Sequence, residues 1–433
     1  MNTKKIFLKY VLFNILSMIG ISCYVLADTL FISNGVGLDG LTALNLTLPV
    51  YNLIFGLGAL IGVGGATRFS ILRAQGKEYD ASAYFTYSFW MTMIVSIPFI
   101  IIGGVFPEIV VKMLGANYEV IDIAAIYLRT FIIFTPFFIF EHVVVTFIRN
   151  DHNPRLASLA MLCATLFNIL FDYILVYPCQ LGMFGAALAT GASPIIALSI
   201  CSLHFFKKQN HFHFVKCYFQ WEYIKNIIQI GFPSFVTELS SGIIVFVFNI
   251  VVFNIGGNTA VASYGIISNL AIVVTSFYNG IAQGIQPLIS QSYAKLNYQN
   301  MKSYLRYAYI TSLIISLFIY VCVIIFPDSI VAIFNSESNL VMAKIAKEGL
   351  FLYFAGFFFV GLNMITTSYF ASIEKMKPSS TLSLLRGGIV IIPLVVILAQ
   401  ILGIHGVWLS FPISELCVFI FALFLKHKEV SYE

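Results

Sequence analysis

The residues best suited to chemistry are acidic side chains that interrupt long apolar segments. Five of them lie well inside such segments: Asp28, Glu141, Asp172, Glu238 and Glu415. A carboxylate at the centre of a bilayer costs roughly 2.5 to 3.5 kcal/mol on insertion scales, so an acid retained there is expected to have a function. We therefore take these five as candidate functional residues.

Two neighbouring segments hold a set of oxygen ligands. Asn168 and Asp172 are four residues apart and therefore share one helix face. Residues 185–190 (GAALAT) form a small-residue surface that lets a neighbouring helix approach, and they end in the hydroxyl of Thr190. Carboxylate, amide and hydroxyl oxygens suit a hard cation such as Na⁺, by extension from calcium and magnesium sites. The same set could instead hold a proton, because a carboxylate removed from water favours its neutral form, or it could merely hydrogen-bond two helices together.

Sequence motifs of enzymes are absent. The chain has no G-x-x-x-x-G-K-[ST] phosphate loop, no G-x-S-x-G elbow and no H-E-x-x-H helix. The glycine-dense residues 62–66 follow no strand, so helix packing explains them better than phosphate binding. The seven cysteines form no C-x-x-C pair and are read as packing residues. We therefore expect no enzyme and no cofactor, and the energy source implied is an ion gradient.

The composition places these residues in a membrane. Of 433 residues, 59% are hydrophobic and 10% are charged, far from the balance of a soluble domain. An apolar helix crosses the ~30 Å hydrocarbon core with about 20 residues. Charges, Pro/Gly/Asn clusters and losses of hydropathy then predict an all-α membrane protein with twelve transmembrane helices, at residues 10–33, 41–72, 84–106, 120–148, 156–177, 183–206, 224–254, 259–292, 303–326, 344–373, 379–402 and 406–426.

Basic residues predict the orientation. An even number of spans places both termini on one side, and 20 of the 24 Lys and Arg residues fall on that side when Arg386 is counted at a span end. The positive-inside rule therefore predicts that both termini are cytoplasmic. The first 33 residues also mimic a signal peptide, but eleven further spans require insertion and not export, so we keep them as the first helix. The net charge of +5 is too small and too dispersed for a nucleic-acid partner.

The sequence repeats itself after 221 residues. Residues 181–188 (LGMFGAAL) are echoed by residues 402–409 (LGIHGVWL), and residues 62–80 run parallel to residues 281–300. Six helices per repeat is an even number, so both halves enter the membrane from the same side. The alternative is a chance likeness between apolar helices.

The repeat predicts two pseudo-symmetric six-helix lobes, an N-terminal lobe at residues 1–206 and a C-terminal lobe at residues 223–433. The cytoplasmic linker between them, residues 207–222, contains His211 and His213. Two histidines without a third ligand are too few for a metal site. We therefore expect the linker to be a solvated loop.

Together these segments resemble the multidrug and toxic compound extrusion (MATE) transporters, and most closely their MepA-like branch. The likeness covers nearly the whole chain, in order. It is carried by residues 27–32 (ADTLFI) leading to 41–45, 149–154 (RNDHNP), 168–172 followed by GAALAT, 231–234 (GFPS), 283–290 (QGIQPLIS) and 406–412 (GVWLSFP).

The resemblance implies a role for each N-lobe candidate. Related members build an ion site from an aspartate of the first helix, the Asn-x-x-x-Asp of the fifth and a threonine of the sixth. The matching residues are Asp28, Asn168, Asp172 and Thr190, which would be the metal ligands if the ion is Na⁺. Tyr24 would line the adjoining substrate cavity, and we assign Phe171 and Asn363 to the substrate cavity as well.

The resemblance is weaker in the C-terminal lobe. Glu238 matches an acid of the seventh helix that many members use there, and we take it as a secondary acidic residue. Residues 356–368 lack the aspartate that some members carry in the tenth helix and offer only Asn363. We therefore expect the ion site in the N-terminal lobe. Tyr24 and Phe171 offer aromatic faces that a cationic substrate can contact.

The resemblance implies an antiporter that exports amphipathic, often cationic drugs or toxic compounds across the cell membrane by alternating access, driven by H⁺ or Na⁺. We expect a monomer in the plasma-membrane bilayer, with small molecules as its other partners. Two alternatives stay open. A flippase for a lipid-linked precursor would need a basic cavity at mid-membrane, and an ion channel would conduct without ion-coupled accumulation.

Overall fold

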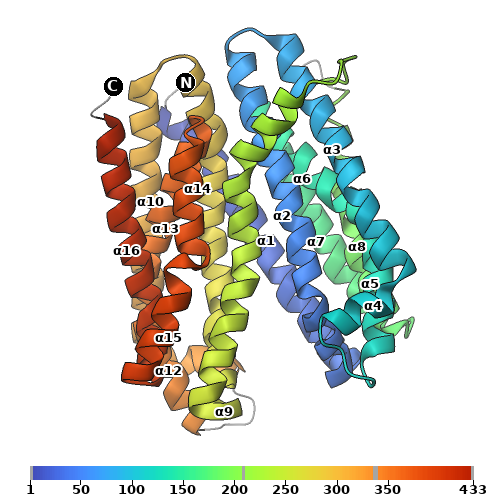
Figure 1. Ribbon diagram of the computed structural model, residues 1–433, viewed down its shortest axis with the longest axis vertical. Helices are drawn as coiled ribbons and strands as arrows, with labels where there is room; N and C mark the ends of the chain where they lie inside the picture. The colour runs from blue at the N-terminus through green and yellow to red at the C-terminus, as the bar shows by residue number, and fades with distance from the viewer. Residues whose placement is uncertain (1–2, 207–209, 335–339, 431–433) are drawn as a thin grey trace. The chain divides into compact units, whose positions relative to one another are not determined.

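The chain is built of helices. The computed structural model describes residues 3–206, 210–334 and 340–430, and within these ranges every regular element is helical (Figure 1). The elements are α1 (Thr3–Gly35), α2 (Leu38–Ala74), α3 (Glu78–Val105), α4 (Pro107–Met113), α5 (Ile121–Ile133), α6 (Thr135–Asn150), α7 (Pro154–Val176), α8 (Gly182–Ser202), α9 (Trp221–Ala294), α10 (Tyr298–Ile325), α11 (Pro327–Phe334), α12 (Leu340–Phe354), α13 (Phe357–Ser372), α14 (Met376–Leu384), the π-helix η1 (Leu385–Ile389), α15 (Ile391–Leu402) and α16 (Ile404–Val430).

Twelve segments of the described chain can span a membrane. Nine helices are long and apolar enough by themselves, and two bent pairs, α5 with α6 and α12 with α13, pass the same test at bends of 47° and 43°. The helix α9 holds two spans, joined at Gly257, whose φ of 60° and ψ of −155° are accessible almost only to glycine. Pro136, in the first turn of α6, lacks a backbone donor and explains the first bend. The predicted twelve-helix membrane fold is confirmed.

Two short helices were not predicted. Each follows the third span of its half, α4 after α3 and α11 after α10, and each begins at a proline, Pro107 or Pro327. Proline suits the first turn of a helix, because its fixed φ is already helical and its missing N–H would have no partner there. The hydropathy pattern indicated that the neighbouring spans end near these prolines, but it did not predict the short helices that follow.

The internal repeat is visible in the backbone. Three pairs of residues with positive φ recur 220, 222 and 221 residues apart: Gly76 with Leu296, His152 with Glu374, and Gly182 with Gly403. The last pair stands at the start of α8 and immediately before α16, where the echoed sequences begin. The two bent spans also occupy the fourth place of each half. Chance similarity of apolar helices would not reproduce these turns at one offset.

The structure separates into two compact units, each described here by itself. Unit 1 comprises residues 1–11, 240–289 and 298–433, and unit 2 comprises residues 12–239 and 290–297. The chain therefore passes from one unit to the other once inside α1, twice inside α9 and once between α9 and α10, and not in the predicted linker. The assignment of lobes to residues 1–206 and 223–433 stays a prediction, and residues 207–209 of the linker lie outside the described residues.

The linker is anchored to unit 2 through a buried carboxylate. Asp151, at the C-terminal end of α6, is 0% exposed in its side chain and accepts a bond from Arg73 of α2. His204 Nε2 lies 2.8 Å from its Oδ2. His211 contributes its backbone N–H at 3.0 Å from Oδ2 and its ring Nδ1 at 3.0 Å from Oδ1. The linker was expected to be a solvated loop, and its His211 side chain is 37% exposed, but His211 is also bound to unit 2.

The next linker residue explains why. Phe212 is fully buried, with its ring against those of Phe85 at 4.7 Å, Phe147 at 5.6 Å and Phe69 at 5.7 Å. Full burial of such a side chain contributes about 1.5 to 3 kcal/mol. His213 points the other way and is exposed. One apolar residue in a charged segment therefore fixes the linker on the helices.

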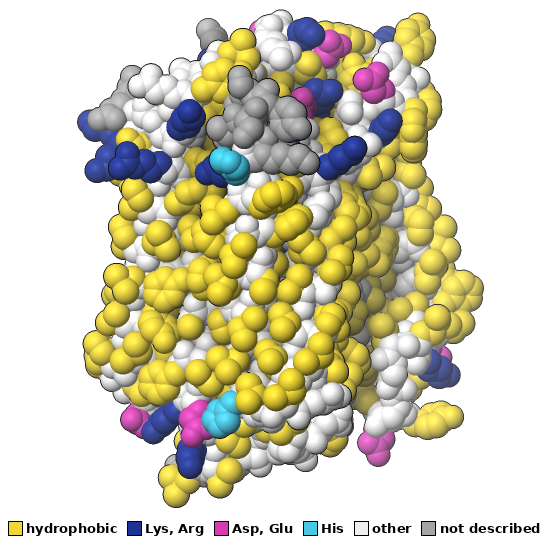
Figure 2. Space-filling view, turned by 60° about the vertical axis from the view of Figure 1, so that its left-hand side comes forward, with side chains coloured by type: hydrophobic (Ala, Val, Ile, Leu, Met, Phe, Trp, Pro, Cys, Tyr) yellow, Lys and Arg dark blue, Asp and Glu magenta, His cyan; other side chains and the backbone are white. Residues whose placement is uncertain are grey.

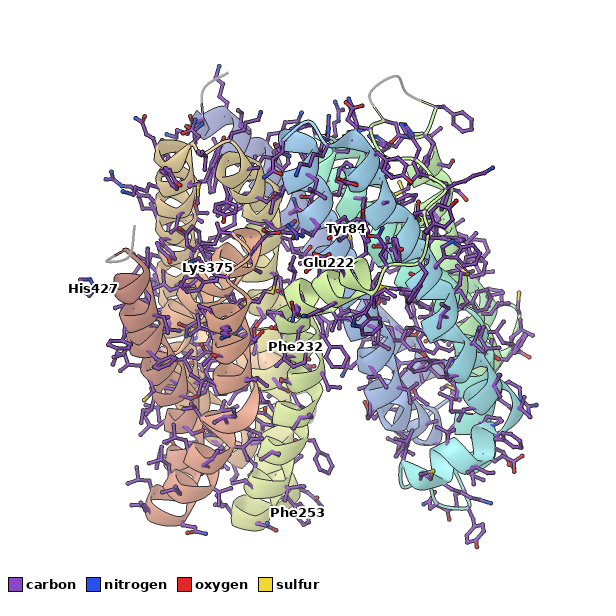
Figure 3. All side chains as sticks on the ribbon, turned by 45° about the horizontal axis from the view of Figure 1, so that its top comes forward. Tyr84, Glu222, Phe232, Phe253, Lys375 and His427 are labelled. Atoms are coloured by element: carbon purple, nitrogen blue, oxygen red, sulfur yellow. The ribbon has the colours of Figure 1, made fainter. Side chains whose placement is uncertain are left out.

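The start of α9 is also fixed on unit 2. Tyr223 stacks on Tyr87 at 4.7 Å between ring centroids, and Asn226 Nδ2 donates to the hydroxyl of Tyr84 at 3.0 Å. Figure 3 labels Tyr84 on α3 and Glu222 at the beginning of α9. The backbones of α2 and α9 also lie in close contact, because a Cβ added at Gly64 of α2 would overlap the carbonyl of Ile227 of α9.

Gly231→Ala is expected to destabilise the protein. A Cβ at Gly231 would overlap the carbonyl of Leu60, so the added methyl forces α2 and α9 apart. Overpacking of this kind costs about 1 to 3 kcal/mol, measurable by thermal unfolding in detergent. Gly265→Ala is the matched control on the same helix, because nothing lies within 4 Å of its added Cβ. Equal unfolding temperatures for the two variants would show that the crossing is not tightly packed.

The start of α1 and the end of α16 lie at the same end of unit 1. The Phe7 ring of α1 lies 5.6 Å from the Tyr307 ring of α10. The Lys426 ammonium of α16 lies 5.0 Å from the centre of the Tyr309 ring, two residues further along α10. This agrees with an even number of spans. On the face shown in Figure 2, hydrophobic side chains cover the middle and Lys and Arg gather at the upper end. The cytoplasmic orientation of the termini stays a prediction.

Candidate functional site

Two adjacent helices of unit 2 supply the first part of the site. Asn168 and Asp172 lie one turn apart on α7 and are 1% and 0% exposed. Asn168 Nδ2 donates to Thr190 Oγ1 of α8 at 3.2 Å. Gly185, Ala186 and Ala187 are buried on the preceding turn of α8. Their small side chains let α8 approach α7, as the sequence predicted.

The helices α1 and α5 complete it. Asp28 of α1 is 6% exposed, and its charge acts directly on that of Asp172. Tyr127 of α5 lies within electrostatic reach of both aspartates and close to Thr190. The four residues Asp28, Asn168, Asp172 and Thr190 therefore gather around one place inside unit 2. Tyr127 was missed, because nothing in the sequence distinguishes it among 23 tyrosines.

The oxygens of this cluster are unpaired. Among the described residues, Asp28 Oδ1, Asn168 Oδ1 and both carboxylate oxygens of Asp172 are buried and have no hydrogen-bond partner. A buried acceptor left without a donor costs about 1 to 3 kcal/mol, and more when it is charged. A cation or a proton would remove that cost. The donor set therefore fits a small hard cation or H⁺.

A transition metal fits less well. In the part of the chain that the structure describes, no group of three or more His, Cys, Asp or Glu side chains could hold a metal ion. Two carboxylates, an amide oxygen and a hydroxyl are oxygen donors without nitrogen or sulfur, which suit hard cations.

Two tyrosines connect this cluster to further acids. The hydroxyls of Tyr24 and Tyr51 are hydrogen-bonded to each other. Asp28 and Glu141 both interact electrostatically with these two tyrosines. Tyr51 also feels the charge of Glu238. Glu238 belongs to the part of α9 that is grouped with unit 2, whereas the resemblance assigned it to the C-terminal lobe. No local sequence pattern had indicated that Tyr51 belongs to the site.

The other two residues predicted to line the cavity, Phe171 and Asn363, have contacts apart from the cluster around Asp172. Phe171 directly precedes Asp172 on α7, and its ring stacks on that of Phe167 at 4.0 Å between ring centroids. Among the described residues it makes no ring contact with Tyr24. Asn363 is fully buried in unit 1, where its Nδ2 donates to Glu415 Oε2 at 2.7 Å and to the Glu415 carbonyl at 2.9 Å. It therefore belongs to a different polar cluster.

The placement of Arg386 at a span end is wrong. The residue lies in η1, ten residues into the span Met376–Leu402, and its Nε donates to Glu415 Oε1 at 2.8 Å. The carboxylate of Glu415 holds it there. A basic residue therefore lies at mid-span, where a flippase would need positive charge, but it is paired with Glu415.

Comparisons with known proteins agree with this fold. The MatE family model matches residues 14–174 and 233–397. The chain is 27% identical over 383 residues to "Multidrug export protein MepA" of Staphylococcus saprophyticus, covering 87% of this chain and 82% of that protein. It is 28% identical over 397 residues to the protein of that name in Staphylococcus haemolyticus, covering 90% and 85%.

Solved structures share the whole architecture. One described as the outward-facing conformation of a multidrug resistance MATE family transporter of the MOP superfamily has a TM-score of 0.93 at 23% identity, covering 100% of this chain and 97% of that one. Another, described as MATE in the bent conformation, has a TM-score of 0.90 at 22% identity, covering 100% and 96%. At these identities the likeness shows the fold. With a family model that matches most of its length, the chain is a member of the MatE family of multidrug and toxic compound extrusion transporters.

Proposed function

We propose that this protein exports amphipathic, often cationic compounds and that entry of H⁺ or Na⁺ at the Asp28–Asp172 cluster drives the export. The observation that carries the proposal is the set of unpaired buried oxygens on Asp28, Asn168 and Asp172. Relatives named multidrug export proteins support the substrate class. The absence of a nucleotide-binding motif from the sequence supports an ion gradient as the energy source.

The mechanism is competition for one negatively charged place. With both aspartates ionised, their mutual repulsion favours a bound cation. A cationic substrate gains from these charges and from the faces of Tyr24 and Tyr51. Once H⁺ or Na⁺ neutralises the aspartates, the attraction is lost and the substrate leaves. The coupling ion can drive the cycle only because it favours one conformation over the other.

The helix α1 is the element we expect to respond. It carries both Asp28 and Tyr24, and one oxygen of Asp28 has no partner to hold it in place. Neutralising Asp28 removes its repulsion from Asp172 and lets α1 bend toward α7. The pocket beside Tyr24 would shrink, and the substrate would be released to the outside.

Export from sealed vesicles tests the proposal. Purified protein is reconstituted into liposomes, and efflux of tetraphenylphosphonium is followed with a pH gradient and a Na⁺ gradient imposed separately. One gradient is expected to drive accumulation against the substrate gradient, and it identifies the ion. Substrate-independent current without accumulation would indicate a channel, and movement of a lipid-linked phosphate would indicate a flippase.

Glu238→Gln is expected to reduce export several-fold without abolishing it. Glu238 acts on Tyr51, which also lies in the field of Asp28, and Glu238 is not one of the four cluster residues. Losing its charge therefore changes the field on the cluster and leaves every ligand in place. Initial rates of gradient-driven efflux measure the effect. Glu222→Gln, an exposed acid on the same helix, is the control and is expected to export at the wild-type rate. Damage equal to that of Asp172→Asn would move the ion site toward Glu238.

A further inference from the structure

The last turns of α1 and α7 are in close contact within unit 2. A Cβ added at Gly35, the last residue of α1, would overlap Val176 Cγ1 at the end of α7. Valine in a helix has one strongly preferred side-chain rotamer, so this methyl group cannot readily turn away. An approach this close requires glycine, because a side chain at residue 35 would push the two helices apart.

Three aromatic rings join the same two helix ends. The ring of Phe31 of α1 lies 6.1 Å from the ring of Tyr173 and 6.1 Å from that of Tyr177, edge-on to both. The rings of Tyr173 and Tyr177 lie 5.4 Å apart, and Tyr177 Oη donates to the carbonyl of Phe31 at 3.4 Å. We call Phe31, Gly35, Tyr173, Val176 and Tyr177 the α1–α7 clamp.

The clamp lies one helical turn from the two aspartates of the ion cluster. Asp28 precedes Phe31 by three residues on α1, and Asp172 precedes Val176 by four residues on α7. Residues three or four apart share one helix face, and one turn rises about 5.4 Å. The clamp and the acid pair are therefore neighbours on the facing surfaces of the same two helices.

Close packing continues on the other side of the acids. A Cβ added at Gly20 of α1 would lie 3.0 Å from Leu162 Cδ2 of α7. Gly20 and Leu162 differ by 142 in sequence number, the glycine and valine of the clamp differ by 141, and Asp28 and Asp172 differ by 144. The helices α1 and α7 therefore run in the same direction side by side, with the two aspartates at matching heights between these contacts.

The distance between the two helices at this height affects how tightly an ion is bound. In the described part of the chain, Asp28 Oδ1 and both carboxylate oxygens of Asp172 are buried without a hydrogen-bond partner. A Na⁺ ion held by both aspartates loses a ligand when they separate. A proton on one aspartate is held less tightly when the charge of the other is farther away. With either ion, moving α1 away from α7 weakens binding.

We propose that the α1–α7 clamp positions Asp28 against Asp172 and thereby sets the affinity of the cluster for its coupling ion. Its members are positioning residues, because they act on the ion only through the two aspartates. This inference rests on the proposed function, in which the ion and a cationic substrate compete for these carboxylates.

Gly35→Ala tests the proposal by forcing the two helices apart. Binding of tetraphenylphosphonium to the purified full-length protein in detergent is measured over a series of pH values and, separately, of Na⁺ concentrations. The ion concentration above which substrate affinity falls gives the Kd of the ion. We expect Gly35→Ala to raise this Kd about tenfold, the lower range for one charge-assisted contact.

The same measurement separates positioning from a general structural defect. When the ion is scarce, both aspartates are ionised in the wild type and in Gly35→Ala, so the substrate should bind with similar affinity to both proteins. Damage to the fold would instead weaken substrate binding at every ion concentration. The shift of the ion Kd is therefore the result that is specific to positioning.

A second substitution should reverse the effect. Val176→Ala removes the methyl group that the new side chain meets, so adding it to Gly35→Ala is expected to return the ion Kd toward the wild-type value. Phe31→Leu keeps an apolar side chain and loses the ring contacts, so a smaller shift in the same direction is expected. It serves as the test if Gly35→Ala folds poorly.

Gly104→Ala is the matched control. Gly104 lies near the end of α3 in the same unit, and among the described residues nothing lies within 4 Å of its added Cβ. It is expected to keep the wild-type ion Kd. A shift in Gly104→Ala equal to that in Gly35→Ala would contradict the role of the clamp.

Two further outcomes bear on the proposal in different ways. An ion-sensitive wild type with an unchanged ion Kd in both Gly35→Ala and Phe31→Leu would overturn the clamp and leave the proposed function standing. A wild type whose substrate affinity responds to neither ion would contradict the proposed function and, with it, this inference.

Discussion

Asp172→Asn is expected to abolish gradient-driven export, with a fall in rate of about a hundredfold. The amide has the shape of the carboxylate but cannot be protonated and carries no charge for Na⁺. The lost charge-assisted contact corresponds to about 3 kcal/mol, which is roughly a factor of a hundred. Both oxygens of Asp172 lack a partner in the protein, so the substitution breaks no internal hydrogen bond and the protein should insert normally.

The control for this variant lies in the same unit. Asp122 is an exposed acid in the first turn of α5, and Asp122→Asn is expected to export normally. Membrane content and unfolding temperature of both variants should match the wild type. Undiminished export by Asp172→Asn would contradict the coupling role, whereas a loss accompanied by poor insertion would identify Asp172 as a structural residue.

Asp151→Ala is expected to lower the free energy of unfolding by about 3 to 5 kcal/mol, the range for removing one partner of a buried ion pair. The carboxylate joins Arg73 of α2, His204 and the linker residue His211, and it is fully buried. Removing it leaves the donors of all three without their acceptor. Thermal unfolding in detergent micelles measures the effect.

A graded series separates charge from hydrogen bonding at this residue. Asp151→Asn keeps one acceptor and should lose less stability than Asp151→Ala. His213→Ala, at an exposed linker position, is the control and should unfold as the wild type does. An Asp151→Ala protein as stable as the wild type would mean that Phe212 alone anchors the linker.

Much of the architecture could be predicted from the sequence, because in lipid every span must be a long apolar helix. The duplication could also be predicted, since the residues that repeat are those that the turns require. Gly182 and Gly403 occupy left-handed backbone positions that few other residues tolerate, so both copies retain glycine.

Part of the candidate site could be predicted for a similar reason. A spacing of four residues on a helix places Asn168 and Asp172 on one face, and small residues mark the surface of α8 that faces them. Tyr127 and Tyr51 could not be found in this way. Their positions depend on how α2 and α5 pack against other helices, which no local pattern encodes.

The errors have one physical cause. Arg386 was placed at the membrane surface and His211 in a solvated loop because charged residues usually lie in water. Each is bound by a buried carboxylate distant in sequence, Glu415 for Arg386 and Asp151 for His211. The position of a charged residue therefore cannot be predicted until its partner is known, and which residue becomes the partner depends on the fold.

Equilibrium binding tests the central claim most directly. The affinity of the purified protein for tetraphenylphosphonium is measured at a series of pH values and, separately, of Na⁺ concentrations. If one ion and the substrate compete for Asp28 and Asp172, the apparent Kd rises about tenfold for each tenfold increase in that ion above its own Kd, as linkage requires, and Asp172→Asn shows no such rise. An affinity in the wild type that neither pH nor Na⁺ alters would contradict the account.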